Sequence, residues 1–417
     1  MSCVYYQLTM KPQSPLRIGG GNTEVTDNDV LLDGRNYPFI PGSSLAGIIR
    51  SMFEEADKEK LFGFVKIDGT SENSKIIVSD AVLDSDTTQN DFTVSVRDGV
   101  GIDKWGMAIP NAKYDFQIIE TQKDFTSIIE CDFDSEEDKA TVEGVLEKIV
   151  QNGICVGAKT TRGFGEMKAE IRKKEFLLNS QDIEEWLNFN PFDKKSFADT
   201  QQLICHVADN VSVKNNICIH FEIKGSLLVR VKEASEKPLE DGTNPDIVTL
   251  KNANGKPVIS GTSWAGAFRH HMHDICNEAG DKCQDIDLLF GKNDAGDHIK
   301  SGLCFKETEI SGGGSMTVMR NAIDRFTGAP ANTALYTTQI WNGGEGKLVI
   351  SYEPGKLSKR QKQILAASII DMNLGLMSIG GEASVGRGIV SIKSLMINGV
   401  ESIDKLKNCE IDMLEEG

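Results

Sequence analysis

The sequence predicts an α+β protein built from two tandem copies of one domain, each with long insertions in its loops. The first observation is an internal repeat: IPGSSLAGIIR at 40–50 returns as ISGTSWAGAFR at 259–269, 219 residues later. The second is that three further short blocks recur in the same order along the chain. Ordered self-similarity of this kind indicates a duplicated structural unit.

The three further blocks divide the chain into matching halves. They pair Leu-Phe-Gly at 61–63 with 289–291, Ile-Asp-Lys-Trp at 102–105 with Ile-Asp-Arg-Phe at 323–326, and Gly157, Gly163 and Gly165 with Gly380, Gly386 and Gly388. We therefore predict domains at 1–175 and 214–399, with a linker at 176–213 and an acidic tail at 400–417. We expect the tail to be peripheral, and Trp186, Phe189 and Phe192 of the linker to pack within the chain or, alternatively, to dock on a neighbour.

Each half shows the same order of elements. A first strand (4–10 and 217–223) precedes a helix that starts at the Gly-Ser-Ser or Gly-Thr-Ser cap, and a second strand follows (76–78 and 304–306). After an insertion come a strand (114–120 and 337–341), a helix (136–151 and 358–372) and a closing strand (166–171 and 389–392). This β-α-β-β-α-β order predicts two ferredoxin-like (RRM-like) domains.

Composition limits the class of protein. The 417 residues are 39% apolar and 26% charged, which is typical of globular chains. Neither a signal peptide nor an apolar run of about 20 residues is visible, and the nine cysteines form no close CxxC pair, so we expect a cytoplasmic protein with reduced thiols. The net charge of −17 argues against binding to nucleic acid, unless a basic groove coexists with acidic faces such as 132–139.

The ordered motifs resemble one family. They are Leu-Arg-Ile-Gly-Gly-Gly at 16–21, Pro-Gly-Ser-Ser-Leu-x-Gly-x-x-Arg at 41–50, Leu-Phe-Gly, the Arg…Ile-Asp-Arg-x-Thr-Gly-Ala stretch at 320–329 and the terminal Gly-rich loops. This set is similar to the RAMP superfamily, and specifically to the guide-RNA-binding backbone subunits of type III CRISPR effector complexes. The fusion of two such domains resembles type III-D-like systems.

The resemblance implies a function and partners. Such subunits bind guide RNA inside a multi-subunit effector complex in the prokaryotic cytoplasm, and a thumb-like β-hairpin from each insertion kinks the duplex of guide and target RNA. Target RNA is cut beside each thumb by a reaction that needs a divalent metal such as Mg²⁺ and an aspartate between the first strand and the first helix. A subunit that only spaces the guide, without cleaving RNA, is the alternative.

Asp27 best matches the position of that aspartate, with Asp29 as an offset alternative. Asp246 lies 219 residues after Asp27, the same offset as the first repeated block. A carboxylate there can hold a divalent metal or orient a 2′-hydroxyl for attack on the adjacent phosphate. The other interpretation is that these aspartates only form turns.

The predicted RNA-binding residues fall into four groups that mostly match across the repeat. Glycines let backbone N–H groups approach phosphates, cations contact phosphates directly and exposed aromatic rings stack on bases. Tight turns, ion-paired arginines and buried aromatics are the structural alternatives. The groups are Gly19, Gly20 and Gly21; Ser43, Ser44 and Arg50 with Thr262, Ser263 and Arg269; Lys104 and Trp105 with Arg325 and Phe326; and Lys159, Arg162, Gly163 and Gly165 with Gly386, Arg387 and Gly388.

Histidine placement separates mechanisms. All six histidines lie at 206 or later, so the first domain cannot use a histidine as general acid or base, which disfavours processing of guide precursors. His270, His273, Cys276 and Cys283 suggest zinc, but their spacing lacks the paired cysteines of a zinc site, and we predict no resident metal there. A metabolic enzyme on a duplicated fold finds no support, since the chain has no Walker-type loop, dinucleotide fingerprint or Ser-His-Asp set.

Overall fold

The computed structural model is an α+β protein that divides into two compact units. It describes residues 2–21, 27–66, 69–103, 108–177, 182–203, 215–231, 245–280, 284–294, 297–352, 355 and 357–408. The first unit comprises Met1–Val96, Asp115–Thr160 and Phe164–Asp209. The second comprises Arg97–Tyr114, Thr161–Gly163 and Asn210–Gly417. Each unit has a large hydrophobic core of its own.

The first unit is built on an antiparallel sheet. Strand β1 (Ser2–Pro12) lies between β13 (Glu166–Leu177) and β11 (Phe125–Phe133). Beyond β11 lie β7 (Ile76–Val78) and β8 (Ala81–Leu83), and β8 pairs with β4 (Phe39–Ile40). At the other edge, β12 (Ile154–Cys155) and β14 (Gln201–Gln202) pair with β13. Because side chains alternate along a strand, β1 turns Val4, Tyr6, Leu8 and Met10 into the core.

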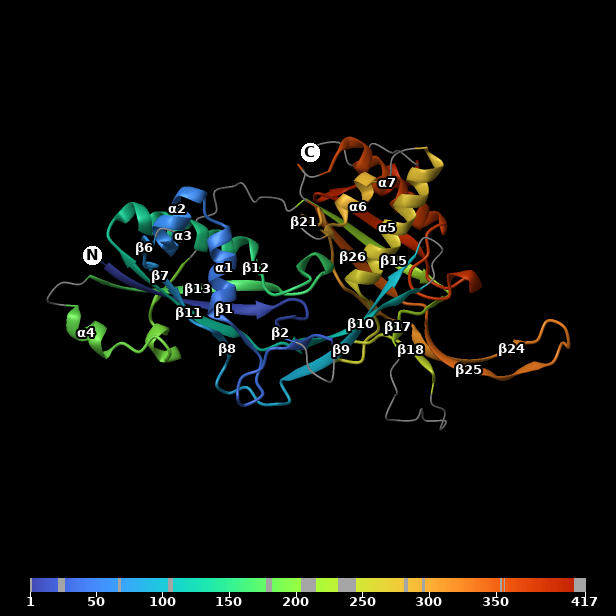
Figure 1. Cartoon of the computed structure of the whole chain (residues 1–417), viewed down its shortest axis with the longest axis horizontal. Helices are drawn as coiled ribbons and strands as arrows, with labels where there is room; N and C mark the ends of the chain where they lie inside the picture. Colours follow the sequence, from blue (N-terminus) through green and yellow to red (C-terminus); the bar gives the residue numbers. More distant parts are fainter. Residues whose placement is uncertain are drawn as a thin grey trace. The chain divides into compact units, whose positions relative to one another are not determined.

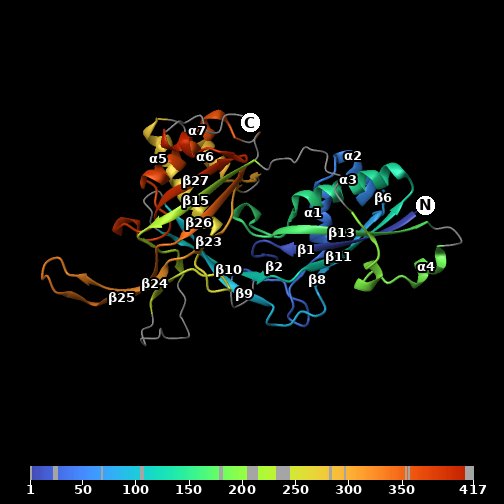
Figure 2. The same ribbon diagram turned by 180° about the vertical axis from the view of Figure 1, so that it is seen from behind.

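Helices cover one face of this sheet. Helices α1 (Gly42–Ser51), α2 (Glu55–Phe62) and α3 (Glu136–Asn152) lie together above it (Figures 1 and 2). The Ser135 side chain caps α3 by accepting a hydrogen bond from the Asp138 N–H. Val142, Leu146 and Ile149 follow at helical spacing and enter the same core as β1.

The linker covers part of the opposite face. Helix α4 (Ile183–Asn188) and a 3₁₀ turn at Lys194–Phe197 belong to a segment whose Trp186 and Phe189 pack on a cluster with Tyr5 and Phe197. The Trp186 Nε1–H donates to the Tyr5 hydroxyl at 3.2 Å. Packing within the chain is thus confirmed for Trp186 and Phe189, whereas Phe192 is 73% exposed.

The second unit repeats this arrangement. Its central strand β15 (Asn216–Lys224) lies between β27 (Ile389–Ile397) and β26 (Glu345–Tyr352). The sheet is completed by β22 (Leu303–Phe305), β23 (Thr308–Ser311), β19 (Val258–Ile259) and β28 (Val400–Glu401). Helices α5 (Gly261–Glu278), α6 (Gln284–Leu289) and α7 (Lys359–Leu374) bury Trp264, Phe268, Leu365 and Ile369 in its core.

The beginning of the acidic tail belongs to this core. Residues after Gly399 continue as β28 and helix α8 (Ile403–Lys407), and Leu406 is 2% exposed within the hydrophobic cluster. The tail is therefore not peripheral up to this point, because one apolar residue on a single helical turn is enough to dock it. Residues 409–417 lie outside the described part.

Each insertion contains a long β-hairpin. Strands β9 (Phe92–Ile102) and β10 (Ala108–Thr121) form one, and β24 (Gly314–Ile323) and β25 (Pro330–Asn342) form the other, which projects from the body of the second unit (Figure 1). Strand β25 also pairs with β16 (Ser226–Leu227) and, in parallel, with β18 (Ile247–Thr249), which pairs with β17 (Arg230–Val231). The remaining short pairs are β2 (Gly19–Gly21) with β3 (Asp29–Val30), β5 (Phe64–Val65) with β6 (Ser71–Glu72), and β20 (Lys292–Asp294) with β21 (Asp297–Ile299).

Within the described residues, no helix has the length and apolar character needed to cross a membrane.

Candidate functional site

Asp27 is attached to the second strand of the first hairpin by two hydrogen bonds. Its backbone N–H donates to Asp115 Oδ1 at 2.9 Å, and its own Oδ2 accepts from the Asp115 N–H at 3.0 Å. Asp115 lies on β10, and Asp27 is exposed while Asp115 is half-buried. Two carboxylates therefore lie next to each other at the surface of the first unit.

Asp246 has the same attachment in the second unit. Its N–H donates to the Thr337 carbonyl at 2.8 Å, and its Oδ2 accepts from the Thr337 N–H at 2.7 Å. Thr337 lies on β25, the second strand of the second hairpin, and Asp246 is exposed. The two aspartates that the sequence paired thus occupy matching structural positions, but a threonine replaces the second carboxylate.

The alternative residue, Asp29, has no such counterpart. It belongs to β3, where it pairs with Gly21, and the residue 219 positions later is Val248. The Gly-rich segment Gly19–Gly21 forms β2 beside it, and Gly19 and Gly20 are exposed. A Cβ on Gly20 would lie 3.2 Å from the Val30 carbonyl, so this glycine allows a close approach of the two strands.

The two terminal Gly-rich loops have the same backbone conformation. The φ angles of Gly157, Gly163 and Gly165 are 86°, 82° and 75°, and those of Gly380, Gly386 and Gly388 are 84°, 83° and 75°. Even a non-glycine residue matches: Lys159 has φ 58° and Glu382 has φ 61°. A left-handed residue other than glycine is uncommon, so its recurrence at the same place shows that the whole loop is conserved between the two halves.

Close packing explains the last glycine of each loop. A Cβ on Gly165 would lie 1.8 Å from the Val156 carbonyl oxygen, and one on Gly388 would lie 1.9 Å from that of Ile379. The Gly165 N–H donates to the Pro15 carbonyl and the Gly388 N–H to the Ser226 carbonyl, both at 2.8 Å. These two N–H groups are used within the chain, so the phosphate contact predicted from them would have to come from other groups of the loops.

Two cations lie on an aromatic ring at the first loop. Lys159 Nζ is 4.1 Å from the centroid of the Phe116 ring, and Arg17 Cζ is 4.8 Å from it. Phe164 packs edge-on against the same ring at 6.0 Å. Cation–π contact holds both cations half-buried near the surface. Phe116 directly follows Asp115 on β10, and successive side chains of a strand point to opposite faces, so the cations on the Phe116 ring are not on the face of Asp115.

The second loop is held by a buried ion pair instead. Arg387 is 5% exposed, and its guanidinium donates to Glu382 Oε2 and to Ser226 Oγ, both at 2.7 Å. Arg320 of β24 contacts the same Glu382 oxygen at 3.2 Å. Arg387 therefore anchors the loop, and its predicted contact with RNA has no support in this arrangement.

Arg162 is also directed inward. Its Nη2 donates to the Phe290 carbonyl at 3.0 Å within the second unit, and burial lowers the pKa of its guanidinium. Gly163 is enclosed in the same unit, where a Cβ would lie 2.7 Å from the Glu307 nitrogen. Lys159 and Arg162 are both half-buried, but Arg162 is bonded to the Phe290 carbonyl whereas Lys159 lies on the Phe116 ring.

The two helix starts differ in how they are capped. At α1 the Gly42 N–H donates to Asp80 Oδ1 at 2.7 Å, and Ser43 and Arg50 are exposed, with Ser44 half-buried. At α5 the Ser260 hydroxyl accepts from the Ser263 N–H and contacts the Thr262 and Ser263 hydroxyls at 2.8 and 2.9 Å. Arg269 is paired with Asp287. The first start thus offers more accessible polar groups than the second.

The second hairpin tip presents an aromatic ring to solvent. Asp324 Oδ1 accepts hydrogen bonds from the N–H groups of Phe326 and Thr327 at 3.0 and 2.7 Å, which lowers the pKa of the Asp324 carboxyl and fixes the turn. Phe326 is 95% exposed, and Arg325 beside it is exposed too. The matching residues of the first half, Lys104 and Trp105, lie outside the described residues.

Comparison with known families gives one match, and it covers both halves. The model of the RAMP superfamily matches residues 9–168 and again residues 209–391. The chain belongs to the RAMP superfamily. The two matches make it a duplicated RAMP, and membership implies a CRISPR-associated subunit that binds RNA. No curated protein matches the chain.

The histidine cluster of this RAMP protein is engaged by protein atoms. The ring nitrogens of His270 contact the carbonyls of Gly266 and Asp103 at 2.8 and 3.2 Å. His271 contacts Asp371 at 2.8 Å and His273 contacts Asp287 at 3.1 Å. Cys276 is buried, and Cys283 lies outside the described residues. These contacts join the three histidines of α5 to neighbouring groups of the protein.

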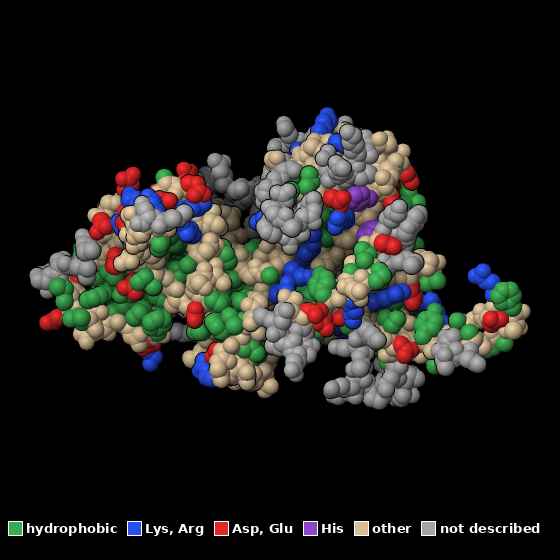
Figure 3. Space-filling view, in the orientation of Figure 1, with side chains coloured by type: hydrophobic (Ala, Val, Ile, Leu, Met, Phe, Trp, Pro, Cys, Tyr) green, Lys and Arg blue, Asp and Glu red, His purple; other side chains and the backbone are tan. Residues whose placement is uncertain are grey.

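Acidic side chains are exposed along helix α2 of the first RAMP domain. Figure 3 shows acidic groups along the outer edge of α2, where Glu54, Glu55 and Asp57 are exposed or half-buried. Lysines on this side are neutralised: Lys58 pairs with Glu55 at 2.6 Å and Lys75 with Asp134 at 3.0 Å. The net charge of −17 is therefore compatible with local positive charge elsewhere, as at Arg17 and Lys159.

Sequence reasoning missed Asp115 and Phe116. A signal existed, because Tyr-Asp-Phe-Gln at 114–117 and Tyr-Thr-Thr-Gln at 336–339 share their first and last residues. Gln117 and Gln339 both contact the short strand that follows the candidate aspartate: Gln117 Oε1 accepts from the Val30 N–H at 3.1 Å, and the Gln339 carbonyl from the Thr249 hydroxyl at 3.1 Å. In both halves the residue after the tyrosine of Tyr-x-x-Gln, Asp115 or Thr337, is the one that donates to the candidate aspartate.

Proposed function

We propose that this protein is a backbone subunit of a type III CRISPR effector complex, of a type III-D-like kind, in which two fused RAMP domains hold guide RNA and cleave the complementary target RNA. The observation that supports cleavage is the matching attachment of Asp27 and Asp246 to the hairpin strands β10 and β25. We read each unit as ferredoxin-like, since β13-β1-β11-β7 and β27-β15-β26-β22 share one strand order.

The attachment suits a carboxylate that acts on RNA. In each site the backbone N–H of the hairpin strand binds Oδ2, and no described residue hydrogen-bonds to Oδ1. A fixed carboxylate of this kind can accept the proton of a 2′-hydroxyl as that oxygen attacks the adjacent phosphorus and the 5′-oxygen leaves. Positioning by the hairpin would place one cut beside each thumb.

The first site also fits a divalent metal. Asp27 and Asp115 supply two adjacent carboxylates, and hard oxygen ligands are those that Mg²⁺ prefers. When bound, the metal would neutralise charge on the phosphate that is attacked. The second site has Asp246 with Thr337, so it offers one carboxylate from this pair of residues.

The second candidate function is a structural subunit that spaces the guide without cleaving RNA. The observation that favours it is that Asp246 pairs with Thr337, whereas Asp27 pairs with the carboxylate of Asp115, so this pair of residues supplies one acidic group. This alternative keeps guide binding and predicts that target RNA stays intact.

Co-purified RNA tests the proposal. The protein is purified from cells that co-express its neighbouring genes, and the bound RNA is sequenced. We expect short RNAs with a constant repeat-derived end and variable spacers; a folded preparation without RNA would rule out the guide-binding role. Incubation with complementary target RNA and Mg²⁺ then separates the two candidates, because intact target with wild-type protein would leave only the structural function.

A further inference from the structure

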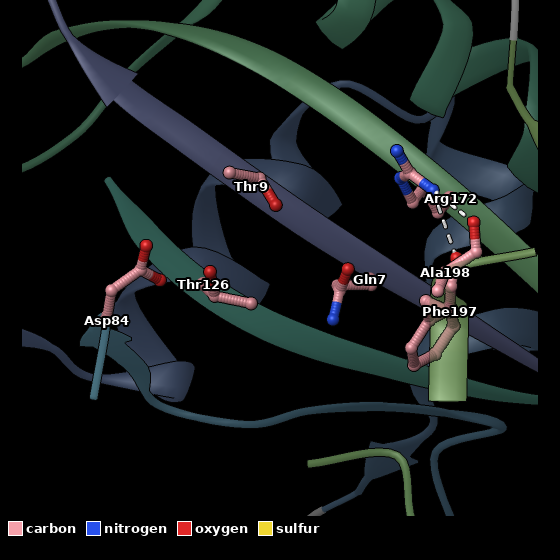
Figure 4. A pocket seen from close by; sticks show the side chains of 7 residues that line it. All are labelled: Gln7, Thr9, Asp84, Thr126, Arg172, Phe197 and Ala198. Atoms are coloured by element: carbon pink, nitrogen blue, oxygen red, sulfur yellow. Dashed lines mark hydrogen bonds between the residues drawn. The ribbon is translucent and has the colours of Figure 1, made fainter. Parts of the chain in front are cut away.

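A polar hollow lies on the face of the first unit's sheet that the helices leave uncovered. It has a volume of about 380 Å³ and is lined by Gln7, Thr9, Asp84, Thr126, Arg172, Phe197 and Ala198 (Figure 4). Thr126 comes from β11, Gln7 and Thr9 from β1 and Arg172 from β13, so the hollow crosses three adjacent strands. Phe197 and Ala198 come from the linker segment that covers the rest of this face. We call this uncovered part the open face.

Polar groups in the hollow have unused hydrogen-bonding capacity. Gln7 is 8% exposed, yet its side-chain amide forms no hydrogen bond with any described residue. The Thr9 and Thr126 hydroxyls, which line the same hollow, likewise have no partner within the described part of the chain. The Gln7 amide is not one of the buried polar atoms that lack a partner, and it lines the hollow together with the two hydroxyls. These three side chains therefore offer hydrogen-bond donors and acceptors to a molecule in the hollow.

Cations border the hollow along the same face. The register pairs Lys11 with Lys168, Thr9 with Glu170 and Gln7 with Arg172. Lys11, Lys168 and Glu170 are exposed, whereas Met10, Met167, Ala169 and Ile171 between them are buried, so these charged groups share the open face. Arg172 Nη1 donates to the Phe197 and Ala198 carbonyls at 3.0 and 3.1 Å.

The lysines of the open face lack the carboxylate partners that nearby lysines have. Lys11 and Lys168 form no ion pair with a described residue. In contrast, Lys139 pairs with Glu175 and Lys174 with Glu185, both at 2.6 Å, and Lys173 with Glu143 at 2.7 Å. In a chain with an excess of 17 acidic charges, uncompensated lysines side by side indicate a site for an anionic ligand.

The second unit provides an internal comparison. On its matching face, Glu222 of β15 pairs with Lys224 at 2.9 Å and with Lys393 at 2.5 Å. Glu222 lies two residues before Lys224, as Thr9 lies two residues before Lys11. The lysines are therefore ion-paired in the second unit, whereas Lys11 and Lys168 form no ion pair with a described residue, although Glu170 shares their face.

We propose that the open face of the first unit binds a segment of single-stranded RNA, separately from the Gly-rich loops and hairpins. Lys11 and Lys168 at one end and Arg172 at the other contact phosphates, while Gln7, Thr9 and Thr126 hydrogen-bond a ribose 2′-hydroxyl and a base edge in the hollow. Lys11 and Gln7 are four residues apart on β1, about 13 Å along the strand, so the cations reach different phosphates of one RNA strand. This inference rests on the proposed RNA-binding function.

Three variants of the full-length protein test the proposal. Lys11→Gln with Lys168→Gln removes the cations, Thr9→Val with Thr126→Val removes two hydroxyls at nearly constant shape, and Thr9→Glu copies the second unit. The matched control is Lys148→Gln, an exposed lysine on the helical face. The probe is fluorescein-labelled oligouridine RNA of about 12 nucleotides, with DNA of the same length for comparison, and anisotropy gives Kd at several salt concentrations.

The variants should weaken binding in different ways. The double lysine variant should bind RNA and DNA about tenfold more weakly, with a salt slope lower by about 1.4 because two phosphate contacts are lost. The double valine variant should lose about threefold for RNA and less for DNA, since DNA has no 2′-hydroxyl. Thr9→Glu should behave as the lysine variant does, and Lys148→Gln as wild type.

Photocrosslinking locates the RNA directly. Oligouridine that carries 4-thiouridine is crosslinked to the wild-type protein, and crosslinked peptides from β1 and β13 are expected. Crosslinks confined to loop and hairpin peptides, together with unchanged Kd values in all three variants, would overturn the open-face site and leave the guide-binding function intact. Absence of RNA from the purified complex would instead remove the proposed function itself.

Discussion

Asp246 and Thr337 hold each other through two hydrogen bonds: the Asp246 N–H donates to the Thr337 carbonyl, and the Thr337 N–H donates to the Asp246 carboxylate. This pairing joins a loop to a hairpin strand 91 residues further along the chain. The carboxylate therefore has a fixed orientation at the base of the hairpin, although the residue itself is exposed. Asp27 accepts from the Asp115 N–H in the same way, but its own N–H donates to the Asp115 carboxylate instead of to a backbone carbonyl.

Replacing each aspartate by asparagine should remove one cut in the target RNA. Asp27→Asn and Asp246→Asn retain an oxygen that can accept from the Asp115 or Thr337 N–H, so we expect the hairpin contact and the fold to persist. The cleavage rate at the corresponding site should fall by at least about 100-fold, because a neutral amide is a poor proton acceptor. Gel analysis of end-labelled target RNA, bound to guide-loaded protein, measures the loss.

Asp29→Asn is the matched control for this pair. Asp29 lies two residues from Asp27 but has no acidic counterpart in the second half, where Val248 stands. Its variant should cut at both sites like wild type. Loss of cleavage in Asp29→Asn with normal cleavage in Asp27→Asn would move the first site to Asp29.

Gly165→Ala should destabilise the first unit strongly. A Cβ there would lie 1.8 Å from the Val156 carbonyl oxygen, at a φ of 75° that alanine rarely adopts. We expect the free energy of unfolding to fall by about 2 kcal/mol or more. Gly47→Ala is the control, since this exposed glycine of α1 has nothing within 4 Å of an added Cβ; it should stabilise by up to about 1 kcal/mol. Urea unfolding measures both, and equal stability of the two variants would contradict the packing argument.

Glu175 should make the stability of the first unit depend on pH. Burial raises the pKa of this carboxyl, but hydrogen bonds and charge from Lys139 and Lys173 outweigh it and leave the pKa below the ordinary 4.5. A lowered folded-state pKa stabilises the fold at pH values above the unfolded-state pKa, and this stabilisation is lost as pH falls below 4.5. Glu175→Gln should therefore lose about 1 kcal/mol at pH 7.

The difference between wild type and Glu175→Gln should shrink as pH falls from 5 through the lowered pKa of Glu175. Glu170→Gln is the control on the same strand, because Glu170 is exposed and forms no ion pair with a described residue. Urea unfolding at several pH values provides the comparison. A constant difference at every pH would show that the two lysines do not act through the charge of Glu175.

Phe326→Ala should change RNA binding without changing stability. The ring is 95% exposed at the hairpin tip, and Asp324 holds the turn through backbone N–H groups that the substitution keeps. We expect less than about 0.5 kcal/mol of destabilisation, against about 3 kcal/mol or more for Phe305→Ala in the core, where the ring is fully buried. If the ring stacks on a base, affinity for guide-paired target RNA should fall about fivefold or more. Unchanged affinity would assign the tip another role.

The sequence predicted what depends on local pattern and on repetition. Strand Ile76–Val78 and helix α3 from Glu136 were expected at those positions, since alternation and helical spacing are read from neighbouring residues. The pairing of Asp27 with Asp246 came from a constant offset alone. The residues that sequence reasoning missed are those whose role depends on contacts between residues far apart in the sequence. Asp115 meets Asp27 across 88 residues.

The direction of a loop arginine shows the same limit. Arg387 was expected to contact RNA because it lies in a Gly-rich loop, but Ser226, 161 residues away, and Glu382 receive its guanidinium. Whether a polar side chain faces inward is decided by which groups the fold brings beneath it. A single sequence contains no signal for that, so the loop was predicted and the side chain's orientation was not.

The left-handed residue shared by the two terminal loops separates backbone shape from charge. Lys159 and Glu382 have φ angles of 58° and 61° in loops whose glycines also match, yet one carries a positive charge and the other a negative one. After a gene duplication, the charged side chains of each copy can change while the backbone conformation of the loop stays the same. The two terminal loops therefore have the same backbone shape but different charge, and they need not bind a polyanion with equal affinity. A fused pair of such domains can bind one end of an RNA strand more tightly than the other.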